Sequence, residues 1–274
     1  MPETLRNPLA GKRILITRAA AQSAALAREL SARGALPAVL PLVSFAEPED
    51  FAPLDHAIAA IAQFGWLILT SAQAVRAFTE RAADLQWPLP RTGSPPRVAC
   101  VGPVTAEAAR KANLPVEYVA AAHSGVALTN ELGSKLHGAK VLLPRSDRAN
   151  PDLPAALRRH GAQVTEVIAY RTLRPGVIDQ AQLAKVAEDQ ADAILFFSPS
   201  AVQHFAELAG AEQLRAFQDK LAITAVGPVT AKALREAGVT RAVVAADTTA
   251  AAVIEALEKY FAVAKAAPVG VRQA

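Results

Sequence analysis

The sequence predicts an α/β protein of two similar domains, each built on a parallel sheet. One observation is an internal repeat: Gly11–Arg18 matches Gly138–Arg145, and Gly34 matches Gly161 at the same offset of 127 residues. The other is that short strand-like runs alternate with alanine-rich amphipathic stretches, a pattern typical of parallel α/β units. A period of this length is that of a whole domain rather than of a solenoid repeat.

Two further blocks extend the repeat in the same order. Thr70–Phe78 matches Phe197–Phe205 at the offset of 127 residues, and Val101–Ala106 is identical to Val226–Ala231 at an offset of 125. Matching blocks in one order and at nearly one spacing indicate a duplication. We expect such a pseudo-symmetric pair of domains to enclose a cleft in which a ligand binds.

The elements follow one another in a regular alternation. Runs rich in β-branched and aliphatic residues predict strands at 13–17, 36–39, 66–70, 97–101, 116–120, 140–143, 164–168, 193–197, 222–226 and 242–245. Alanine-rich amphipathic stretches predict helices at 22–33, 72–83, 105–112, 125–136, 152–160, 200–209, 230–237 and 249–261. Gly34, Gly161 and Gly238 stand where a left-handed residue commonly ends a helix. Segments rich in Pro, Asp or Gln predict loops at 46–55, 84–96 and 174–190.

Two extended segments, 40–45 and 168–173, occupy equivalent positions in the repeat and fit neither sheet cleanly. We interpret them as connectors at which the chain crosses to the other domain and returns. This interpretation predicts a discontinuous domain 1 from 1–39 with 174–262, a domain 2 from 46–167, and a tail at 263–274. It also predicts that strand 13–17 shares a sheet with 193–197 and 222–226.

Composition excludes several classes of protein. No apolar run reaches the ~18 residues of a membrane span, and the N-terminus lacks the apolar core of a signal peptide, so we expect a soluble cytoplasmic protein without membrane contact. The single cysteine, Cys100, excludes a disulfide framework. Basic residues are scattered, so no nucleic-acid partner is predicted. The net charge of +4 suits a small polyanionic ligand, or equally an ordinary solvated surface.

Candidate ligand-binding residues stand just beyond the predicted strands, because ligands of parallel α/β sheets bind past the carboxyl ends of the strands. They are Arg18, Ser71, Thr105, Ser124, Arg145, Ser198, Ser200, Gly227 and Thr230. For each hydroxyl taken singly, capping of the following helix is the commoner role. Taken together, several helix N-termini at one edge offer free N–H groups that suit carboxylates or phosphates.

Motifs for cofactors are missing from the sequence. No dinucleotide-binding or phosphate-binding glycine motif follows a strand, and the histidines lack metal-ligand spacing, so we expect a protein without a cofactor or metal. Tyr170 stands in the second connector, where a phenol can hydrogen-bond a ligand or act as a weak general acid. The alternative is a tyrosine that packs on the connector with its hydroxyl in water.

At these positions the chain resembles the uroporphyrinogen-III synthase family. The segments that carry the resemblance are Ile14–Arg18, Leu67–Ser71, Val101–Ala106, Val167–Tyr170, Phe196–Val202 and Ala225–Ala231. They span about residues 11–260, and their order and spacing are specific even though each is short. The resemblance implies two flavodoxin-like parallel-sheet domains joined by a two-stranded linker.

The resemblance also implies a function, namely that of a cofactor-independent, cyclising lyase of tetrapyrrole and heme biosynthesis. Its substrate would be hydroxymethylbilane, a linear tetrapyrrole with eight carboxylates, and its product uroporphyrinogen III, formed by loss of water with inversion of ring D. By position, Tyr170 would assist departure of the hydroxyl, and Thr105, Ser198 and Thr230 would hold carboxylates. The alternative is a two-domain protein that binds or senses a small ligand without catalysis. We expect either protein to be a monomer.

Overall fold

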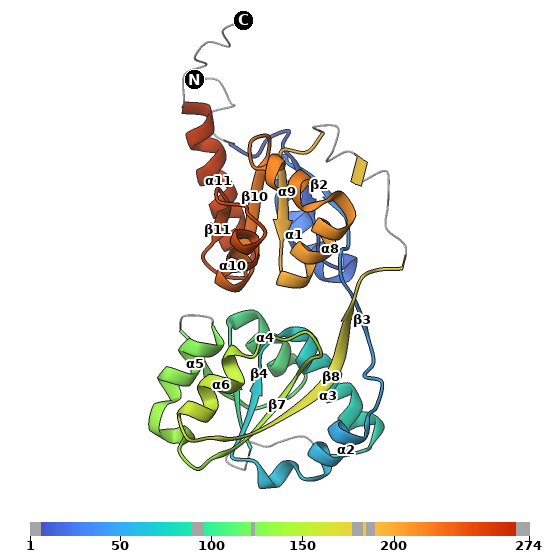
Figure 1. Cartoon of the computed structure of the whole chain (residues 1–274), viewed down its shortest axis with the longest axis vertical. Coiled ribbons are helices and arrows are strands. Elements are labelled where there is room, and N and C mark those ends of the chain that lie inside the picture. Colours follow the sequence, from blue (N-terminus) through green and yellow to red (C-terminus); the bar gives the residue numbers. More distant parts are fainter. Residues whose placement is uncertain (1–6, 89–95, 122–123, 177–182, 185–189, 267–274) are drawn as a thin grey trace, which may run out of the picture. The chain divides into compact units, whose positions relative to one another are not determined.

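The computed structural model describes residues 7–88, 96–121, 124–176, 183–184 and 190–266. Its contacts divide the chain into two units: unit 1, Met1–Ser44 with Arg174–Ala274, and unit 2, Phe45–Leu173 (Figure 1). We propose that these units are the two domains predicted from the repeat. Within the described residues, no helix is long and apolar enough to cross a membrane.

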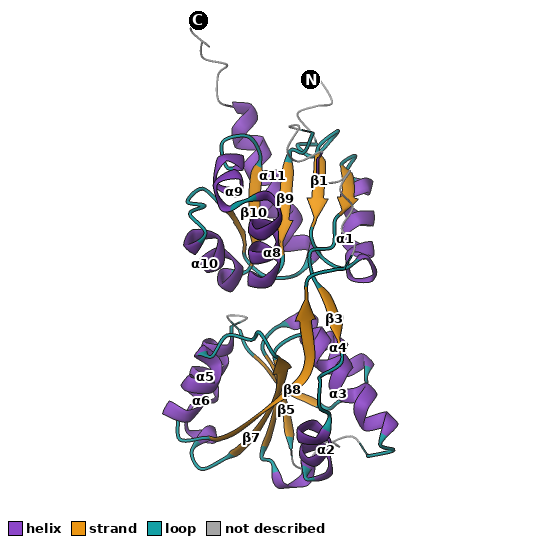
Figure 2. Ribbon diagram, turned by 45° about the vertical axis from the view of Figure 1, so that its right-hand side comes forward, coloured by secondary structure: helices purple, strands orange, loops and turns teal. Residues whose placement is uncertain are grey.

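Unit 1 contains a five-stranded sheet in the order β2-β1-β9-β10-β11. Its strands are β1 (Arg13–Ile16), β2 (Leu36–Val39), β9 (Ala193–Phe196), β10 (Ala222–Val226) and β11 (Val243–Ala245). Its helices are α1 (Ala20–Ala32), α8 (Pro199–Ala209), α9 (Ala211–Phe217), α10 (Pro228–Glu236) and α11 (Ala250–Ala266). Helices cover both faces of the sheet, with one apolar core under α8, α9 and α10 and another under α1 and α11 (Figure 2).

Unit 2 contains a six-stranded sheet in the order β3-β8-β7-β4-β5-β6. Its strands are β3 (Ser44–Ala46), β4 (Trp66–Leu69), β5 (Arg97–Cys100), β6 (Val116–Val119), β7 (Lys140–Ser146) and β8 (Gln163–Leu173). Its helices are α2 (Ala52–Ala59), α3 (Ala72–Asp84), α4 (Pro103–Lys111), α5 (Gly125–Leu132) and α6 (Asp152–Arg159), with short 3-10 turns at Ile61–Gln63 and Gly133–Leu136. One core lies under α2, α3 and α4, and the other under α5 and α6.

The duplication appears as one strand order used twice. The repeat aligns β7 and β8 with β1 and β2, and β4, β5 and β6 with β9, β10 and β11. The order β8-β7-β4-β5-β6 of unit 2 is therefore the order β2-β1-β9-β10-β11 of unit 1. Both are the flavodoxin-like order 2-1-3-4-5. In unit 2 the first of these strands along the chain, β4, takes the third place in that order. This confirms the predicted fold class of two similar parallel-sheet units.

Strand pairing also confirms the predicted exchange between sheets. β1 pairs in parallel with β9, which in turn pairs with β10, so strand 13–17 does share a sheet with 193–197 and 222–226. Central strands such as β4, β9 and β10 are buried at every residue, as parallel strands covered on both faces must be. The edge strands β2 and β6 are partly exposed.

The three predicted helix stops are confirmed. Gly34, Gly161 and Gly238 directly follow the C-cap residues of α1, α6 and α10, with φ of +73°, +82° and +88°. At Gly161 a Cβ atom would also lie 2.7 Å from Nδ1 of His137. Any other residue at position 161 would therefore add backbone strain and also a clash with His137.

Several element boundaries predicted from the sequence are wrong. The predicted loop 46–55 contains the start of α2, because the Asp50 carboxylate accepts a hydrogen bond from Ala52 N–H at 2.8 Å and Pro53 stands in the first turn. α9 and β3 were not predicted, and α3 runs one residue into the predicted loop 84–96. Residues 168–173, predicted as an extended connector, are extended and continue β8, so the predicted strand 164–168 is longer than expected.

Other predicted segments have different bounds in the structure, or lie partly outside the described residues. α11 continues through Ala266, so 263–266 of the predicted tail 263–274 are helical, and 267–274 lie outside the described residues. Parts of the predicted loops 84–96 and 174–190, namely 89–95, 177–182 and 185–189, also lie outside them. The predicted helix 125–136 is α5 followed by a 3-10 turn from Gly133.

A charged pair joins α2 to α3 in unit 2. Arg81 donates two hydrogen bonds to the Asp55 carboxylate, from Nε at 2.7 Å and from Nη2 at 2.6 Å. The guanidinium also lies over the ring of Phe51, 4.2 Å from its centre. Hydrogen bonding from Arg81 lowers the pKa of the Asp55 carboxyl below its usual value.

Asp55→Asn is expected to lower the free energy of unfolding at neutral pH, and to lower it much less in acid. Because the folded-state pKa of Asp55 is lowered, the ion pair stabilises the fold fully above the unfolded-state pKa of about 4, and this stabilisation is lost as the pH falls through the folded-state value. Urea unfolding of both proteins as a function of pH measures the difference. Glu107→Gln, in the exposed pair with Lys111, is the control and should have a small effect. A difference for Asp55→Asn that is constant with pH would contradict this expectation.

Candidate active site

In unit 2 the helices α3, α4 and α5 begin where β4, β5 and β6 end, so their N-termini share the carboxyl edge of the sheet. Ser71 caps α3 by accepting a hydrogen bond from Ala74 N–H at 3.0 Å, and Ser124 caps α5 in the same way at 3.1 Å from Ala127 N–H. Thr105 lies buried in the first turn of α4. Ser71 and Ser124 thus have the capping role given above as the commoner one for such hydroxyls.

Unit 1 repeats this arrangement at its own carboxyl edge. Ser198 caps α8 by accepting a hydrogen bond from Ala201 N–H at 3.2 Å, and the half-buried Ser200 lies in the first turn of α8. Gly227 is the residue before α10, with φ +89°, and Thr230 is buried one turn later. Substrate contact by the predicted hydroxyl residues of either edge stays a prediction. Capping contacts account for the positions of Ser71, Ser124 and Ser198.

Tyr170 is the predicted residue that the structure places in contact with another predicted one. Its hydroxyl lies 3.2 Å from Oγ of Ser71, although the two residues are 99 positions apart in the chain. The ring is only 9% exposed and packs edge-to-face on Phe45, with 5.5 Å between ring centres. Burial raises the pKa of the phenol, so Tyr170 is protonated and uncharged at neutral pH. Both the role in the reaction and the alternative role of packing on the connector stay predictions.

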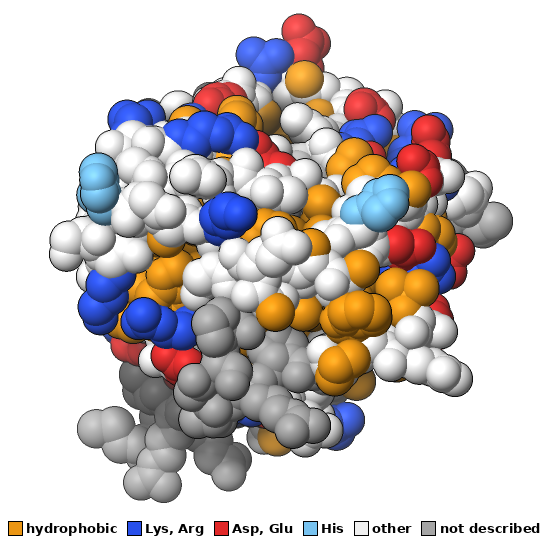
Figure 3. All heavy atoms as spheres, turned by 90° about the horizontal axis from the view of Figure 1, so that it is seen from below, with side chains coloured by type: hydrophobic (Ala, Val, Ile, Leu, Met, Phe, Trp, Pro, Cys, Tyr) orange, Lys and Arg blue, Asp and Glu red, His pale blue; other side chains and the backbone are white. Residues whose placement is uncertain are grey.

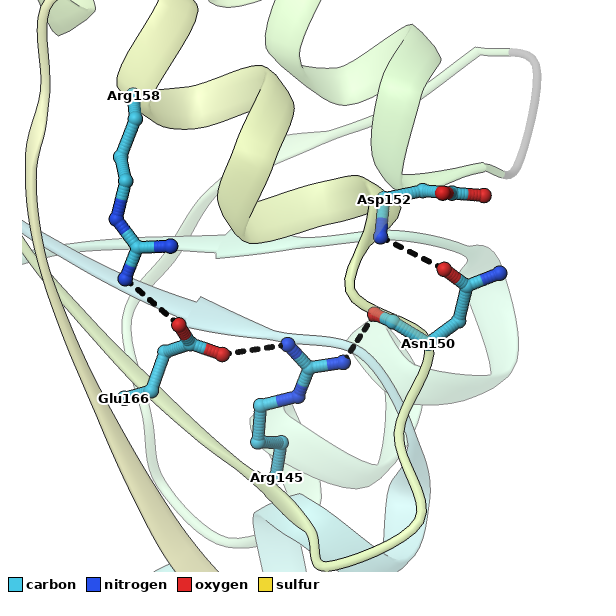
Figure 4. A network of polar contacts seen from close by, with 5 residues as sticks. All are labelled: Arg145, Asn150, Asp152, Arg158 and Glu166. Carbon is cyan, nitrogen blue, oxygen red and sulfur yellow. Dashed lines mark hydrogen bonds and ion pairs between the residues drawn. The ribbon is translucent and has the colours of Figure 1, made fainter.

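Arg145 is held by the protein itself (Figure 4). It is 8% exposed; its Nη1 donates to Glu166 at 2.8 Å and its Nη2 donates to the backbone carbonyl of Asn150. Glu166 also accepts from Arg158 on α6, 2.7 Å away. Two strands, a loop and a helix are thus joined around one guanidinium. This favours a structural role, and the predicted substrate contact of Arg145 stays a prediction.

Arg18, the counterpart of Arg145 in the repeat, has different surroundings. Its Nε donates to Gln22 at 2.8 Å, and its guanidinium lies 5.4 Å from the centre of the Phe197 ring. Burial lowers the pKa of Arg18. The guanidinium lies between the ends of β1 and β9, the point at which the strand order of unit 1 changes direction and where α/β sheets commonly bind ligands.

Sequence reasoning missed two polar residues next to Tyr170, Asp147 and Thr172. Asp147 lies beyond the carboxyl end of β7 and Thr172 near the end of β8. The signal available was the position of Asp147 directly after Arg145-Ser146, a strand end already selected. An open pocket of about 180 Å³ lies beside Asp147 and the Arg145 network, lined by Arg145, Ser146, Asp147, Ala149, Pro151, Glu166, Val167 and Ile168, and Tyr170 is not part of its lining.

Nothing in the described residues gathers three or more metal-ligating side chains at one place. Burial raises the pKa of the Cys100 thiol to about 12, so it stays protonated at neutral pH and is a poor nucleophile. On the face shown in Figure 3, basic and acidic side chains are interspersed between apolar ones instead of forming areas of one sign. That distribution agrees with the scattered charges of the sequence.

Comparison with protein families decides the relationship. The family model described as uroporphyrinogen-III synthase HemD (HEM4) matches residues 3–255, which include all of unit 2, most of unit 1 and every candidate residue above. The chain belongs to the uroporphyrinogen-III synthase family. The predicted resemblance is thereby confirmed.

Individual relatives agree with membership of the uroporphyrinogen-III synthase family. A uroporphyrinogen-III synthase of Synechococcus elongatus is 34% identical over 236 residues, covering 84% of this chain and 88% of the relative. Among solved structures, a mutant uroporphyrinogen III synthase of Thermus thermophilus matches with a TM-score of 0.64 at 23% identity, covering 93% of this chain and all of that one. The Helicobacter pylori enzyme matches at a TM-score of 0.55 and 18% identity, covering 89% and 97%. At these identities the two structures support the fold alone.

Proposed function

We propose that this protein is a uroporphyrinogen-III synthase, a cyclising lyase that converts hydroxymethylbilane to uroporphyrinogen III and water. The observation that carries the proposal is the family match over residues 3–255, together with the 34% identity to a named synthase over most of both chains. In the reaction, the hydroxyl of the linear tetrapyrrole departs as water. Ring D then inverts through a spiro intermediate, and a carbon–carbon bond closes the macrocycle.

Helix N-termini are the proposed binding sites for the carboxylates of the substrate. The first turns of α3, α4, α5, α8 and α10 lie at the carboxyl edges of the two sheets and offer backbone N–H groups and the positive ends of helix dipoles. In this role Thr105, Ser124, Ser198, Ser200, Gly227 and Thr230 shape the first turns that would meet the carboxylates. Arg18 adds a positive charge at the edge of unit 1.

Tyr170 is the proposed general acid for departure of the hydroxyl. Ser71 Oγ already accepts a hydrogen bond from Ala74 N–H, and its single proton is then available for Tyr170 Oη. In that arrangement the phenol proton of Tyr170 is left to donate to the substrate. The raised pKa keeps this proton in place at neutral pH. Ser71 thus orients the phenol instead of holding a carboxylate by itself.

Catalysis is proposed to require no metal or organic cofactor. Once the hydroxyl has left, the resulting azafulvene is strongly electrophilic, and the main task of the protein is to hold the chain ends in the geometry for ring closure. The monomeric state and the cytoplasmic location predicted from the sequence stay predictions.

Incubation of the purified protein with hydroxymethylbilane, in buffer containing a chelator, tests this function. A synthase consumes hydroxymethylbilane faster than the uncatalysed reaction and gives the type III isomer with the chelator present. A protein of the alternative class, which binds or senses a small ligand, would bind hydroxymethylbilane without accelerating its conversion.

A further inference from the structure

The pairing between β7 and β8 contains an irregularity just before Tyr170. Arg145 pairs with Ile168, but the next residue of β7, Ser146, pairs with Tyr170, so that Ala169 is an extra residue in β8. One extra residue in one strand of a pair is a β-bulge, a feature that re-aims side chains and is frequent beside active sites.

The bulge determines where the Tyr170 side chain points. Side chains alternate between the faces of a strand, and Val167 is buried while Ile168 is 48% exposed. With regular alternation and no bulge, Ala169 would point inward and Tyr170 outward. Instead Ala169 and Tyr170 are both buried in the same core, and Thr172 is buried two residues later. Contact between Tyr170 and Ser71 therefore depends on the bulge.

Asp147 and Ser146 hold β8 in this bulged form. Asp147 N–H donates to the carbonyl of Tyr170 at 3.3 Å, and the Asp147 carboxylate accepts from Thr172 N–H at 2.9 Å. The same carboxylate oxygen accepts from the Ser146 hydroxyl at 2.9 Å. Ser146 Oγ lies 2.7 Å from Thr172 Oγ1, which must be the donor because Ser146 has already donated its only proton. The turn after β7 thus fixes β8 on both sides of Arg171.

Arg171 itself is held by the segment that follows β3. Its Nε donates to the carbonyl of Glu47 at 2.8 Å, and its Nη1 contacts the Glu49 carboxylate at 2.6 Å. The three consecutive residues of β8 that follow the extra Ala169 are therefore anchored alternately inward and outward. β7 ends at Ser146, and beyond the bulge the Asp147 carboxylate takes the place of a backbone partner by accepting the hydrogen bond from Thr172 N–H.

We propose that Asp147 is a positioning residue for Tyr170, whose carboxylate stabilises the bulge in β8 that directs the phenol to Ser71. The proposal rests on the proposed function insofar as Tyr170 takes part in the reaction. Asp147 acts through backbone and hydroxyl contacts and is not assigned a contact with the substrate.

Asp147→Ala is expected to lower kcat by about tenfold to hundredfold, the range expected when a catalytic group is displaced by about 1 Å. KM for hydroxymethylbilane should change less than about twofold, because carboxylate binding at the helix N-termini is untouched. Asp147→Asn should restore most of the rate, since its amide oxygen can still accept from Thr172 N–H and Ser146 Oγ. In the Tyr170→Phe background, Asp147→Ala should cause no further loss, because the group that it positions is gone.

Asp55→Ala is the matched control, an aspartate of the same unit whose carboxylate joins α2 to α3 through Arg81. It should lower the melting temperature without changing kcat in either background. If Asp147→Ala lowers kcat by the same factor with and without the Tyr170 hydroxyl, or if Asp147→Asn loses as much as Asp147→Ala, the proposal is overturned. Should Asp147→Ala fail to fold, Thr172→Val, which removes only the hydroxyl contact to Ser146, should give a smaller loss with the same dependence on Tyr170.

A spectroscopic readout separates this proposal from the proposed function. The chain has three tyrosines, so NMR of protein labelled at the tyrosine ring carbon that bears the hydroxyl gives few signals, and Tyr170→Phe identifies that of Tyr170. At neutral pH, Asp147→Ala should shift this signal, whereas Asp147→Asn and Asp55→Ala should leave it near the wild-type position. The readout is the chemical shift and not the titration, because both Asp147 variants lose a charge that raises the pKa of Tyr170. An unchanged Tyr170 signal in Asp147→Ala would overturn the positioning role, even if the wild-type protein proved inactive on hydroxymethylbilane.

Discussion

Tyr170→Phe is expected to lower kcat by about 10²–10⁴-fold, the usual contribution of a general acid. The substitution keeps the ring that packs on Phe45 and removes only the hydroxyl beside Ser71, so the fold and KM should be nearly unchanged. Because burial raises the pKa of Tyr170, wild-type activity should not fall through ionisation of this phenol in neutral or mildly alkaline buffer. Steady-state kinetics with circular dichroism measures both effects.

Tyr118→Phe is the control for this experiment. Tyr118 lies on β6, donates a hydrogen bond to Glu131 at 3.0 Å and has no assigned role in the reaction. It should retain the wild-type rate. Ser198→Ala and Thr230→Ala should each lower the rate much less than Tyr170→Phe, because neighbouring N–H groups still bind the carboxylates. If Tyr170→Phe keeps most of the wild-type rate while forming the type III product, Tyr170 is a packing residue and its catalytic assignment is wrong.

Phe205→Ala is expected to lower the free energy of unfolding of unit 1 by about 3–5 kcal/mol, the usual cost of emptying a buried phenylalanine site. Phe205 is fully buried, with its ring centre 5.5 Å from that of Phe196 and 6.1 Å from that of Phe217. Its counterpart in the repeat, Phe78, is equally buried in unit 2, and Phe78→Ala should have a loss of the same order.

Denaturant unfolding measures these losses. Leu36→Ala serves as the control, because Leu36 is 59% exposed on the edge strand β2 and should change the free energy of unfolding by less than about 0.5 kcal/mol. A loss for Phe205→Ala as small as that of Leu36→Ala would contradict the close packing of the unit 1 core.

The equivalence of the two sheets was predictable from the repeat, whereas the flavodoxin-like fold of each was implied by the family resemblance. Once Gly11–Arg18 and Gly138–Arg145 are aligned, each strand of unit 1 has a counterpart in unit 2, and strand runs of aliphatic residues show that both faces are covered. α2 was missed because its start depends on the contact between Asp50 and Ala52 N–H, whereas the prolines and acidic residues around it favoured a loop.

The candidate site was predictable in its location but not in its contacts. Ser71 was predicted from its position at a strand end, and Tyr170 from its place in the second connector. Sequence periodicity does not show that these two residues, 99 positions apart, share a hydrogen bond. The bulge at Ala169 has no sequence signature, since regular alternation would have turned Tyr170 outward. Arg18 and Arg145 occupy equivalent positions, but only the structure distinguishes the internally held Arg145 from Arg18.

The isomer composition of the product tests the proposed function most directly. Purified protein is incubated with hydroxymethylbilane, the reaction is stopped early, and the type I and type III uroporphyrins obtained by oxidation are separated and quantified. Closure of the free tetrapyrrole without inversion gives type I, so a synthase is expected to yield type III as the main product at a rate proportional to the protein concentration. A type I product at the same rate with and without the protein would contradict the assignment of this chain as a uroporphyrinogen-III synthase.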